Sequence, residues 1–282
     1  MSEIHVFNHR AMATHFQVRI AGEEKNYAAS TAQETFGLLD KMEARLSRFR
    51  VTSEISQIKE LKPGETLRLN VSVFRCLQIA KKMEQATRGA FSITAAALQT
   101  QKEPPQWTLL PESLSIRCDA GKLEFDLGAV GKGFALDQMA ELLREWSCPI
   151  FLLVAGGSSI LAGDAPPETA GWSCGLGDDN SPHRYFLKNC SLSGSGLAVK
   201  GKHILDPRTG QPAQRENRIW ALADTAAESD ALSTAAMVLE EKEIIEILAP
   251  EKSWLAFLQE NENARPLGSR ALPPQAWPAC PN

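Results

Sequence analysis

The sequence predicts an α+β fold with largely antiparallel sheets flanked by helices. Apolar stripes at helical spacing and short alternating strands are mixed along the 282 residues, without the regular strand–helix–strand alternation that indicates a parallel sheet. We find no internal repeat and no linker-like segment, so we expect a single domain over residues 1–262. The Pro-rich segment 263–282 is expected to be an extended or loosely attached tail.

The first half of the chain predicts a strand, three helices and a pair of strands. Residues 14–20 alternate polar and apolar side chains, which is typical of a strand. Residues 26–47 carry an apolar stripe at helical spacing, a second helix is expected to start near Ser53, and a third covers 71–89 and ends in a glycine. Residues 115–128 are typical of two strands around an Asp-Ala-Gly turn.

The second half predicts one long helix followed by a series of short elements. The helix over 129–146 has two glycines in its first turns, an unusual choice because glycine disfavours helix formation. Residues 149–163 predict a buried strand, a glycine turn and a second strand. The remaining expected elements are strands at 171–177, 183–189, 190–196 and 253–259, and helices at 228–241 and 242–248.

Charge and composition argue against several classes of protein. The net charge is −4 and no stretch concentrates Lys and Arg, so a nucleic-acid partner is not expected. No apolar run approaches the ~20 residues that cross a bilayer, and the N-terminal residues lack the apolar core of an export signal. We therefore expect a cytoplasmic protein without a membrane span. The six cysteines show no Cys-x-x-Cys pair and no zinc-finger spacing, so we interpret them as reduced core thiols.

The segment "SDALSTAA" carries polar side chains on one face of an expected helix. Asp230 and Thr234 stand four residues apart and therefore share that face, with Ser233 beside them. Because the flanking residues are Ala and Leu, these oxygens need partners, and an oxygen-only set suits a hard cation such as Mg²⁺. The alternative is that Ser229 or Asp230 caps the helix, and spacing alone does not separate the two interpretations.

Two glycine-rich segments are candidates for contact with a ligand. In "FDLGAVGKGFALD" an acidic residue ends a strand, glycines follow and a helix opens, so backbone N–H groups there could bind phosphate with help from Lys132. Phe134 follows Gly133, so this is not a Walker A loop, and the alternative is a tight turn with glycines for packing. The segment "VAGGSSILAG" is either a hairpin turn or a close backbone approach to a ligand.

The segment "HILDPRTG" places His203 three residues ahead of a turn. Asp206 and Pro207 open the turn and Gly210 closes it, with the proline fixing φ. Histidine is the natural general base near neutral pH, so His203 is either a base held by a rigid corner or a structural residue at the end of a strand. No Gly-x-Ser-x-Gly motif and no thiol-protease signature is present, so those hydrolase classes are not indicated.

Seven segments follow one another along the chain: "AMATHFQV", "RLSRFRVTSEISQI", "GAFSITAAAL", "DLGAVGKGFALD", "LLVAGGSSILAG", "HILDPRTGQP" and "DALSTA". Taken together and in this order, they resemble the flavin transferase family known as ApbE. The segment "DLGAVGKGFALD" is especially similar to the family pattern D-L-G-x-[IV]-x-K-G-[YF]-A-[VL]-D. The resemblance runs from about Ala11 to Leu239 and implies an ApbE-like, T-fold-like architecture.

The resemblance implies an enzyme that splits FAD at its pyrophosphate. FMN is then joined through a phosphoester to a Thr or Ser of a partner flavoprotein, and AMP leaves, with FAD as substrate and Mg²⁺ as cofactor. The implied metal-site residues are Asp230, Ser233, Thr234 and the backbone carbonyl of Ala129. The implied general base is His203, with Asp206 and Arg208 holding its loop. The implied FAD contacts are Met12, Phe49, Ile93, Thr94, Ala95, Asp126, Lys132 and Leu205.

The chain departs from the family pattern at several positions. Phe49 stands where tyrosine is usual, which keeps a stacking ring and loses a hydroxyl. Ser92, Ala96 and Ala97 replace the usual Asp, Gly and Pro, and the segment before His203 is shorter than usual. Because that segment is implied to face the partner protein, the partner is expected to be unusual.

Two further functions stay open at the level of sequence. One is an FAD pyrophosphatase that releases FMN and AMP, since it needs the same metal site. The other is a non-catalytic FAD-binding protein, for which loss of His203, Asp230 or Thr234 would be expected; all three are present. The chain contains no S/T-G-A-T acceptor segment, so self-modification is not indicated.

Overall fold

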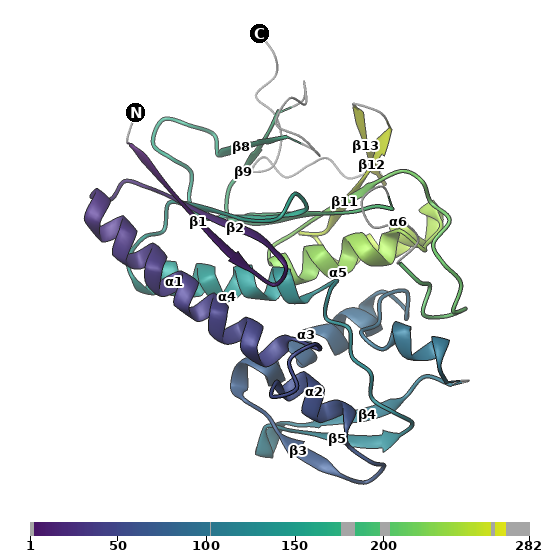
Figure 1. Ribbon diagram of the computed structural model, residues 1–282. Coiled ribbons are helices and arrows are strands. Elements are labelled where there is room, and N and C mark those ends of the chain that lie inside the picture. Colours follow the sequence, from purple (N-terminus) through teal and green to yellow (C-terminus); the bar gives the residue numbers. More distant parts are fainter. Residues whose placement is uncertain (1–2, 102, 176–183, 198–203, 261–262, 269–282) are drawn as a thin grey trace.

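The computed structural model describes residues 3–101, 103–175, 184–197, 204–260 and 263–268. Within them the chain forms one eight-stranded sheet, two small sheets and six α-helices (Figure 1). The helices are α1 Lys25–Leu46, α2 Glu54–Lys59, α3 Val71–Ala86, α4 Gly131–Glu145, α5 Ala226–Ala236 and α6 Glu241–Leu248. The strands are β1 Ile4–Ala11, β2 Thr14–Ala21, β3 Thr66–Arg68, β4 Gln106–Leu110, β5 Ser115–Ala120, β6 Phe151–Ala155, β7 Ser159–Ala162, β8 Trp172–Gly175, β9 Arg184–Leu187, β10 Cys190–Ser195, β11 Ile219–Ala223, β12 Leu255–Glu260 and β13 Asn263–Leu267.

The large sheet has the order β1-β2-β6-β7-β10-β11-β12-β13, and every neighbouring pair is antiparallel. Helices α1, α4 and α5 lie along one face of it, and the β8–β9 ribbon lies against the other (Figure 1). The central strands are therefore covered on both sides: Leu153 packs into the core under the helices and Leu152 into the core under the ribbon. The predicted α+β class with largely antiparallel sheets is confirmed.

Most of the expected helices and strands form where the hydrophobic pattern placed them. On β2 the alternate side chains Phe16, Val18 and Ile20 are fully buried, as period-2 patterning requires. On α1 the stripe that includes Leu39 and Met42 is buried against the core. The five described cysteines are buried, in agreement with core thiols, and the sixth lies outside the described residues.

The expected second strand in residues 115–128 is wrong. Strand β5 forms, but it pairs with β3 and β4 in the three-stranded sheet, and no strand follows the turn. The backbone of the following segment bonds elsewhere: the Lys122 N–H donates to the Gln101 side chain at 2.9 Å, and the Asp126 N–H donates to the Ile93 carbonyl at 2.7 Å. The segment after β5 is therefore an irregular connection that leads to α4, and its backbone binds the loops around Gln101 and Ile93.

The expected boundary between domain and tail at residue 263 is also wrong. Residues 263–267 form β13, which pairs with β12 at the edge of the large sheet, and Leu267 is buried in the core. Residues 269–282 lie outside the described structure. In the described part of the chain, no helix is both long enough and apolar enough to cross a membrane, and the cytoplasmic location stays a prediction.

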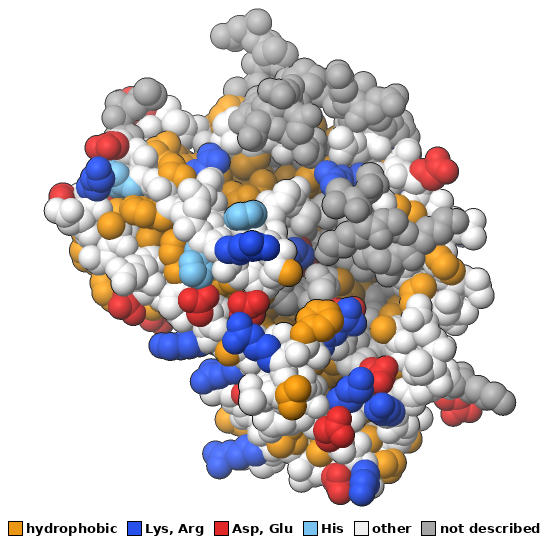
Figure 2. Space-filling model, in the orientation of Figure 1, with side chains coloured by type: hydrophobic (Ala, Val, Ile, Leu, Met, Phe, Trp, Pro, Cys, Tyr) orange, Lys and Arg blue, Asp and Glu red, His pale blue; other side chains and the backbone are white. Residues whose placement is uncertain are grey.

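The face of the molecule drawn in Figure 2 carries both signs of charge. Basic and acidic side chains are interspersed across it, with apolar side chains between them, and no continuous basic stripe is visible. Elsewhere in the structure, opposite charges pair across elements, for example Lys82 on α3 with Glu228 on α5 at 2.7 Å, and Arg88 with Glu246 on α6 at 2.8 Å. The mixed pattern agrees with the small net charge of the chain.

Candidate active site at the junction of α4 and α5

Helices α4 and α5 approach each other so closely that one position admits only glycine. A Cβ placed on Gly133 would lie 2.1 Å from the carbonyl oxygen of Ala226 and 2.7 Å from the nitrogen of Ala227. These contacts are with backbone, which cannot move aside as a flexible side chain can. The unusual glycine in the first turn of α4 is therefore explained by close helix packing, one of the two interpretations that the sequence left open.

The two helices cap each other through a pair of aspartates. No side chain of α4 caps its own N-terminus, and instead the Gly133 N–H donates to Oδ2 of Asp230 on α5 at 2.8 Å. In return, Asp137 on α4 accepts the N–H groups of Ala226 at 2.7 Å and Ala227 at 2.9 Å, the first two residues of α5. This exchange fixes the rotation of each helix against the other.

The interpretation of Ser229 or Asp230 as a helix cap is wrong. The N-cap of α5 is Thr225, whose side-chain oxygen accepts the Glu228 N–H at 3.3 Å, so Asp230 lies in the second turn of the helix. The Asp230 carboxylate is thus free to bind groups from outside its own helix.

Asp137 is a buried carboxyl group that titrates within the physiological range. Burial raises the pKa of Asp137 from 3.8 to about 7, although the two backbone N–H donors act in the opposite direction. Between about pH 4 and pH 7 the folded protein keeps a proton that the unfolded chain has lost. The contribution of Asp137 to stability is therefore largest below about pH 4, declines as the pH rises from about 4 to about 7, and is lost above that.

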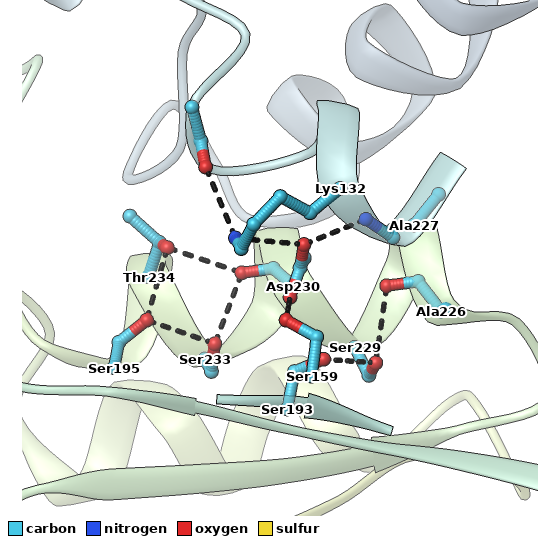
Figure 3. Close-up of polar contacts among 12 residues, drawn as sticks. Lys132, Ser159, Ser193, Ser195, Ala226, Ala227, Ser229, Asp230, Ser233 and Thr234 are labelled. Atoms are coloured by element: carbon cyan, nitrogen blue, oxygen red, sulfur yellow. Dashed lines mark hydrogen bonds and ion pairs between the residues drawn. The ribbon is translucent and has the colours of Figure 1, made fainter. Parts of the chain in front are cut away.

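Asp230 is itself buried, with a side chain only 5% exposed, and three donors from three directions surround its carboxylate. The hydroxyl of Ser159, at the start of β7, donates to Oδ1 at 2.6 Å. The Gly133 N–H binds Oδ2 at 2.8 Å, and the ammonium of Lys132 lies 3.4 Å from the same oxygen. Figure 3 shows Lys132 reaching across from α4 while Ser159 approaches from the sheet.

A cluster of hydroxyl groups adjoins Asp230 on α5. The Ser233 and Thr234 hydroxyls donate to the Asp230 backbone carbonyl at 3.0 and 3.1 Å. The Ser195 hydroxyl at the end of β10 lies 2.9 Å from that of Ser233 and 3.1 Å from that of Thr234 (Figure 3). The structure therefore brings together Asp230, Ser233 and Thr234, as predicted from sequence, and adds Ser195.

Residues 126–130 form the loop that leads into α4. Asp126 starts this loop: its Oδ1 accepts the Gly128 N–H at 2.9 Å, and its Oδ2 pairs with Arg48 at 3.0 Å. The Gly128 carbonyl lies 3.4 Å from the Lys132 ammonium, and Ala129 follows it in the chain. Ala129 therefore sits in the loop that borders the Asp230 cluster, next to the residue that contacts Lys132.

The loop 47–53 presents an exposed aromatic ring beside Asp126. Phe49 is 82% exposed, and the guanidinium of Arg48 lies over its ring at 4.8 Å from the centroid. The same Arg48 pairs with Asp126, so one side chain links the ring to the loop before α4. An open aromatic face of this kind suits a planar ligand ring.

The remaining predicted FAD contacts lie in three other places. Met12 is at the tip of the β1–β2 hairpin with φ of 50° and packs against the core. Ile93 and Thr94 are buried next to the start of a 3₁₀ turn at Ala95, and the Ile93 carbonyl binds Asp126 as described above. Leu205 forms an isolated β-bridge with Pro212 across the Asp-Pro-Arg-Thr-Gly turn.

That turn is fastened to the rest of the protein by Arg208. Its guanidinium binds both carboxylate oxygens of Asp206, at 3.0 and 2.9 Å, and also Oε1 of Glu243 on α6 at 2.9 Å. These bonds and partial neutralisation by Arg208 hold the pKa of Asp206 below its usual value, although burial acts in the other direction and is the largest single influence. His203, the predicted base, lies outside the described residues.

Comparison with known proteins assigns the chain to a family. A family model described as "ApbE family" matches residues 12–258, most of the chain. The chain belongs to the ApbE family. Curated relatives include proteins named FAD:protein FMN transferase from Haemophilus influenzae, 25% identical over 88% of this chain and 83% of the relative, and from Treponema pallidum, 25% identical over 73% and 70%.

Solved structures of ApbE proteins share the fold. The flavin transferase ApbE from Vibrio cholerae superposes with a TM-score of 0.79 at 17% identity and covers 94% of this chain and 97% of its own. The ApbE protein from Thermotoga maritima gives 0.77 at 19% identity, with 91% and 94% covered. The expected ApbE-like architecture is confirmed.

Sequence reasoning missed several residues of this ApbE site. Asp137 ends the segment "DLGAVGKGFALD", but nothing in its own surroundings predicts that it caps α5. Ser159 and Ser195 lie on separate strands, and only the order of strands in the sheet brings them to α5. Arg48 precedes the predicted ring residue Phe49, and a charged residue at that position was a signal that could have been used.

The donor chemistry of the cluster fits a hard divalent cation. A carboxylate, hydroxyl groups and a nearby backbone carbonyl are the oxygen ligands that Mg²⁺ prefers, and the ammonium of Lys132 shows that positive charge is accommodated there. No group of three or more His, Cys, Asp and Glu side chains that could hold a metal occurs among the described residues. The site thus offers one carboxylate supported by neutral oxygens.

Proposed function

We propose that this ApbE chain is a Mg²⁺-dependent FAD:protein FMN transferase. It would split FAD at its pyrophosphate, attach FMN through a phosphoester to a Thr or Ser of a partner flavoprotein, and release AMP. One observation carries the proposal, in a chain whose curated relatives carry that name: a buried carboxylate, that of Asp230, meets a lysine at the first turn of α4, and a cluster of hydroxyl groups adjoins the same aspartate.

The first turn of α4 suits the pyrophosphate of FAD. Four N–H groups at a helix N-terminus lack partners within the helix, and the helix dipole favours negative charge there. Two of these groups in α4 are already used: the Gly131 N–H donates to the Leu127 carbonyl at 2.6 Å, and the Gly133 N–H donates to Asp230 at 2.8 Å. Lys132 in the same turn supplies an ammonium for phosphate oxygens. The remaining FAD contacts in this proposal are Met12, Phe49, Ile93, Thr94, Ala95, Asp126 and Leu205.

Phe49 and Asp126, which Arg48 links, would have different roles. The exposed ring of Phe49 offers a stacking face for a flavin or adenine ring, and it needs no hydroxyl group for that role. Asp126, held by Arg48 and by the Gly128 N–H, keeps the loop before α4 in one shape. The Phe49 ring and the first turn of α4 are thereby held in a fixed position relative to each other.

Asp230, Ser233, Thr234 and the carbonyl of Ala129 are the residues that would hold Mg²⁺. Bound there, the metal would supply neutralisation of the charge that builds on the pyrophosphate during transfer. The protein's own contribution is to aim the carboxylate, because Ser159 and Gly133 fix both of its oxygens without adding charge.

In the transfer step, His203 would accept the proton of the target hydroxyl. The hydroxyl oxygen forms a bond to the phosphorus of the FMN half, the bond from that phosphorus to the bridging oxygen breaks, and AMP leaves with the electron pair. The rigid Asp206–Arg208 pair would hold the loop that follows His203. Fixing that loop limits the positions from which the base can act.

The experiment is to incubate the purified protein with FAD and Mg²⁺, with and without a domain carrying an S/T-G-A-T acceptor segment. AMP release and the intact mass of the acceptor are followed together. The proposal predicts AMP and an acceptor heavier by one FMN, both dependent on Mg²⁺. AMP without modification of any acceptor would favour the FAD pyrophosphatase instead, and bound FAD without either product would make the protein a flavin-binding protein.

A further inference from the structure

The ammonium of Lys132 lies next to the Asp230 carboxylate, where a metal ion bound by that carboxylate would also have to lie. It lies 3.4 Å from Oδ2 of Asp230 and 3.4 Å from the carbonyl of Gly128 (Figure 3). In ion pairs that form strong hydrogen bonds the nitrogen–oxygen distance is about 2.7–2.9 Å, so both contacts are loose. The lysine supplies charge to this carboxylate and little directional bonding.

The geometry of Asp230 does not depend on that lysine. The shorter bonds come from the Ser159 hydroxyl at 2.6 Å and the Gly133 N–H at 2.8 Å, one to each carboxylate oxygen. Both donors are neutral, and both belong to well-packed positions: Ser159 is fully buried, and Gly133 lies against the backbone of α5. Orientation and charge neutralisation of the carboxylate are thus performed by different groups.

The partly exposed Lys132 ammonium can also move away from Asp230. Its side chain is 24% exposed, whereas that of Asp230 is 5% exposed, so the ammonium stands at the outer side of the pair. It belongs to the first turn of α4, where an anion would be attracted. A divalent cation on Asp230 would repel the ammonium, and an anion at the helix N-terminus would attract it.

We propose that Lys132 is an exchangeable counter-charge for Asp230. In the ligand-free protein its ammonium neutralises the buried carboxylate; a divalent cation takes that place, and the ammonium turns to the pyrophosphate of the substrate. The inference rests on the proposed function and adds a consequence to it. Metal and dinucleotide strengthen each other's binding by the same factor, because either ligand helps to separate Lys132 from Asp230.

The test measures metal binding to the flavin-free protein, with Mn²⁺ as the probe and the signal of free Mn²⁺ in electron paramagnetic resonance as the readout. Lys132→Met removes the competing charge, so it is expected to bind Mn²⁺ about fivefold more tightly than the wild type, the upper range for a partly exposed ion pair. Lys132→Arg keeps the charge and is expected to resemble the wild type.

Lys82→Met is the matched control, because Lys82 also pairs with an acidic residue of α5, Glu228, at 2.7 Å but outside the cluster. It should leave Mn²⁺ affinity unchanged if the effect is local. A second readout is thermal stability: Mg²⁺ should raise the melting temperature of Lys132→Met more than that of the wild type. Should Lys132→Met fail to fold, Lys132→Gln replaces it, with the same expected result.

The outcomes separate this inference from the proposed function. If the wild type binds Mn²⁺ and Lys132→Met binds it equally or more weakly, Lys132 is not an exchangeable counter-charge, while the metal-dependent function stands. If the wild type takes up no Mn²⁺ either alone or with FAD present, the metal dependence of the proposed function is wrong and the inference is overturned with it.

Discussion

Replacing Gly133 by alanine tests whether the close approach of α4 and α5 builds the site. The added Cβ would begin 2.1 Å from the Ala226 carbonyl oxygen, and real Cβ contacts are essentially never below 3.0 Å. The helices must therefore separate by about 1 Å, since the contacting atoms are backbone. The same separation stretches the bond from the Gly133 N–H to Asp230, which is 2.8 Å long.

The expected magnitude follows from three contributions. Overpacking costs about 1–3 kcal/mol, and weakening a buried bond to a carboxylate costs about 1–3 kcal/mol more. The gain in helix propensity from glycine to alanine is about 1 kcal/mol. Gly133→Ala should therefore lower the free energy of unfolding by about 1–5 kcal/mol. It should also weaken divalent-cation binding, because Asp230 loses the donor that aims it.

The assay is urea denaturation of Gly133→Ala beside Gly37→Ala. Gly37 lies inside α1, and a Cβ there meets nothing within 4 Å, so this variant should be more stable than the wild type by up to about 1 kcal/mol. Opposite signs for the two substitutions are the expected result. If Gly133→Ala is as stable as the wild type, or more stable, then α4 and α5 do not approach as closely as described. The explanation of the Asp230 orientation through the Gly133 N–H is then wrong too.

Three further predictions concern the cap, the turn and the base. Asp137→Ala should lower the free energy of unfolding by about 1–3 kcal/mol, because two N–H groups of α5 lose their acceptor. Asp137→Asn should flatten the decline of the unfolding free energy between about pH 4 and pH 7, because the titrating group is gone. Denaturation at several pH values measures both effects. In Arg208→Lys, the single ammonium cannot bind both oxygens of Asp206 and Glu243 at the same time. The loop that follows His203 is then held less firmly, so kcat for flavin transfer should fall more than the affinity for FAD. His203→Ala should keep FAD binding and lose transfer by ~10²–10⁴-fold, and a wild-type rate would make His203 a structural residue.

The periodicity of apolar residues predicted most individual helices and strands correctly, because one face of each element packs against the core. It could not predict where β5 pairs, since strand pairing depends on segments far away in the sequence: β5 lies between β3 and β4 rather than beside the segment that follows it. Nor could it predict β13, because a Pro-rich composition hides a strand whose order comes from pairing with β12.

The candidate site was predicted where chemistry and spacing act within one element. Asp230, Ser233 and Thr234 share a helix, so a four-residue spacing sufficed to place them together. Ser159 and Asp137 contribute through contacts between elements, and no local pattern distinguishes them from ordinary polar residues. The glycine at position 133 was noticed as unusual, but its reason, the backbone of Ala226, lies 93 residues away in the chain.

The measurement that tests the central claim most directly is the intact mass of an S/T-G-A-T acceptor domain after incubation with FAD, Mg²⁺ and one of three enzymes. These are the wild type, Asp230→Asn, and Asp224→Asn as a control at an exposed acidic residue just before α5. The account predicts an added FMN with the wild type and with Asp224→Asn, and none with Asp230→Asn. An added FMN at an unchanged rate with Asp230→Asn would contradict the assignment of the α4–α5 junction as the active site.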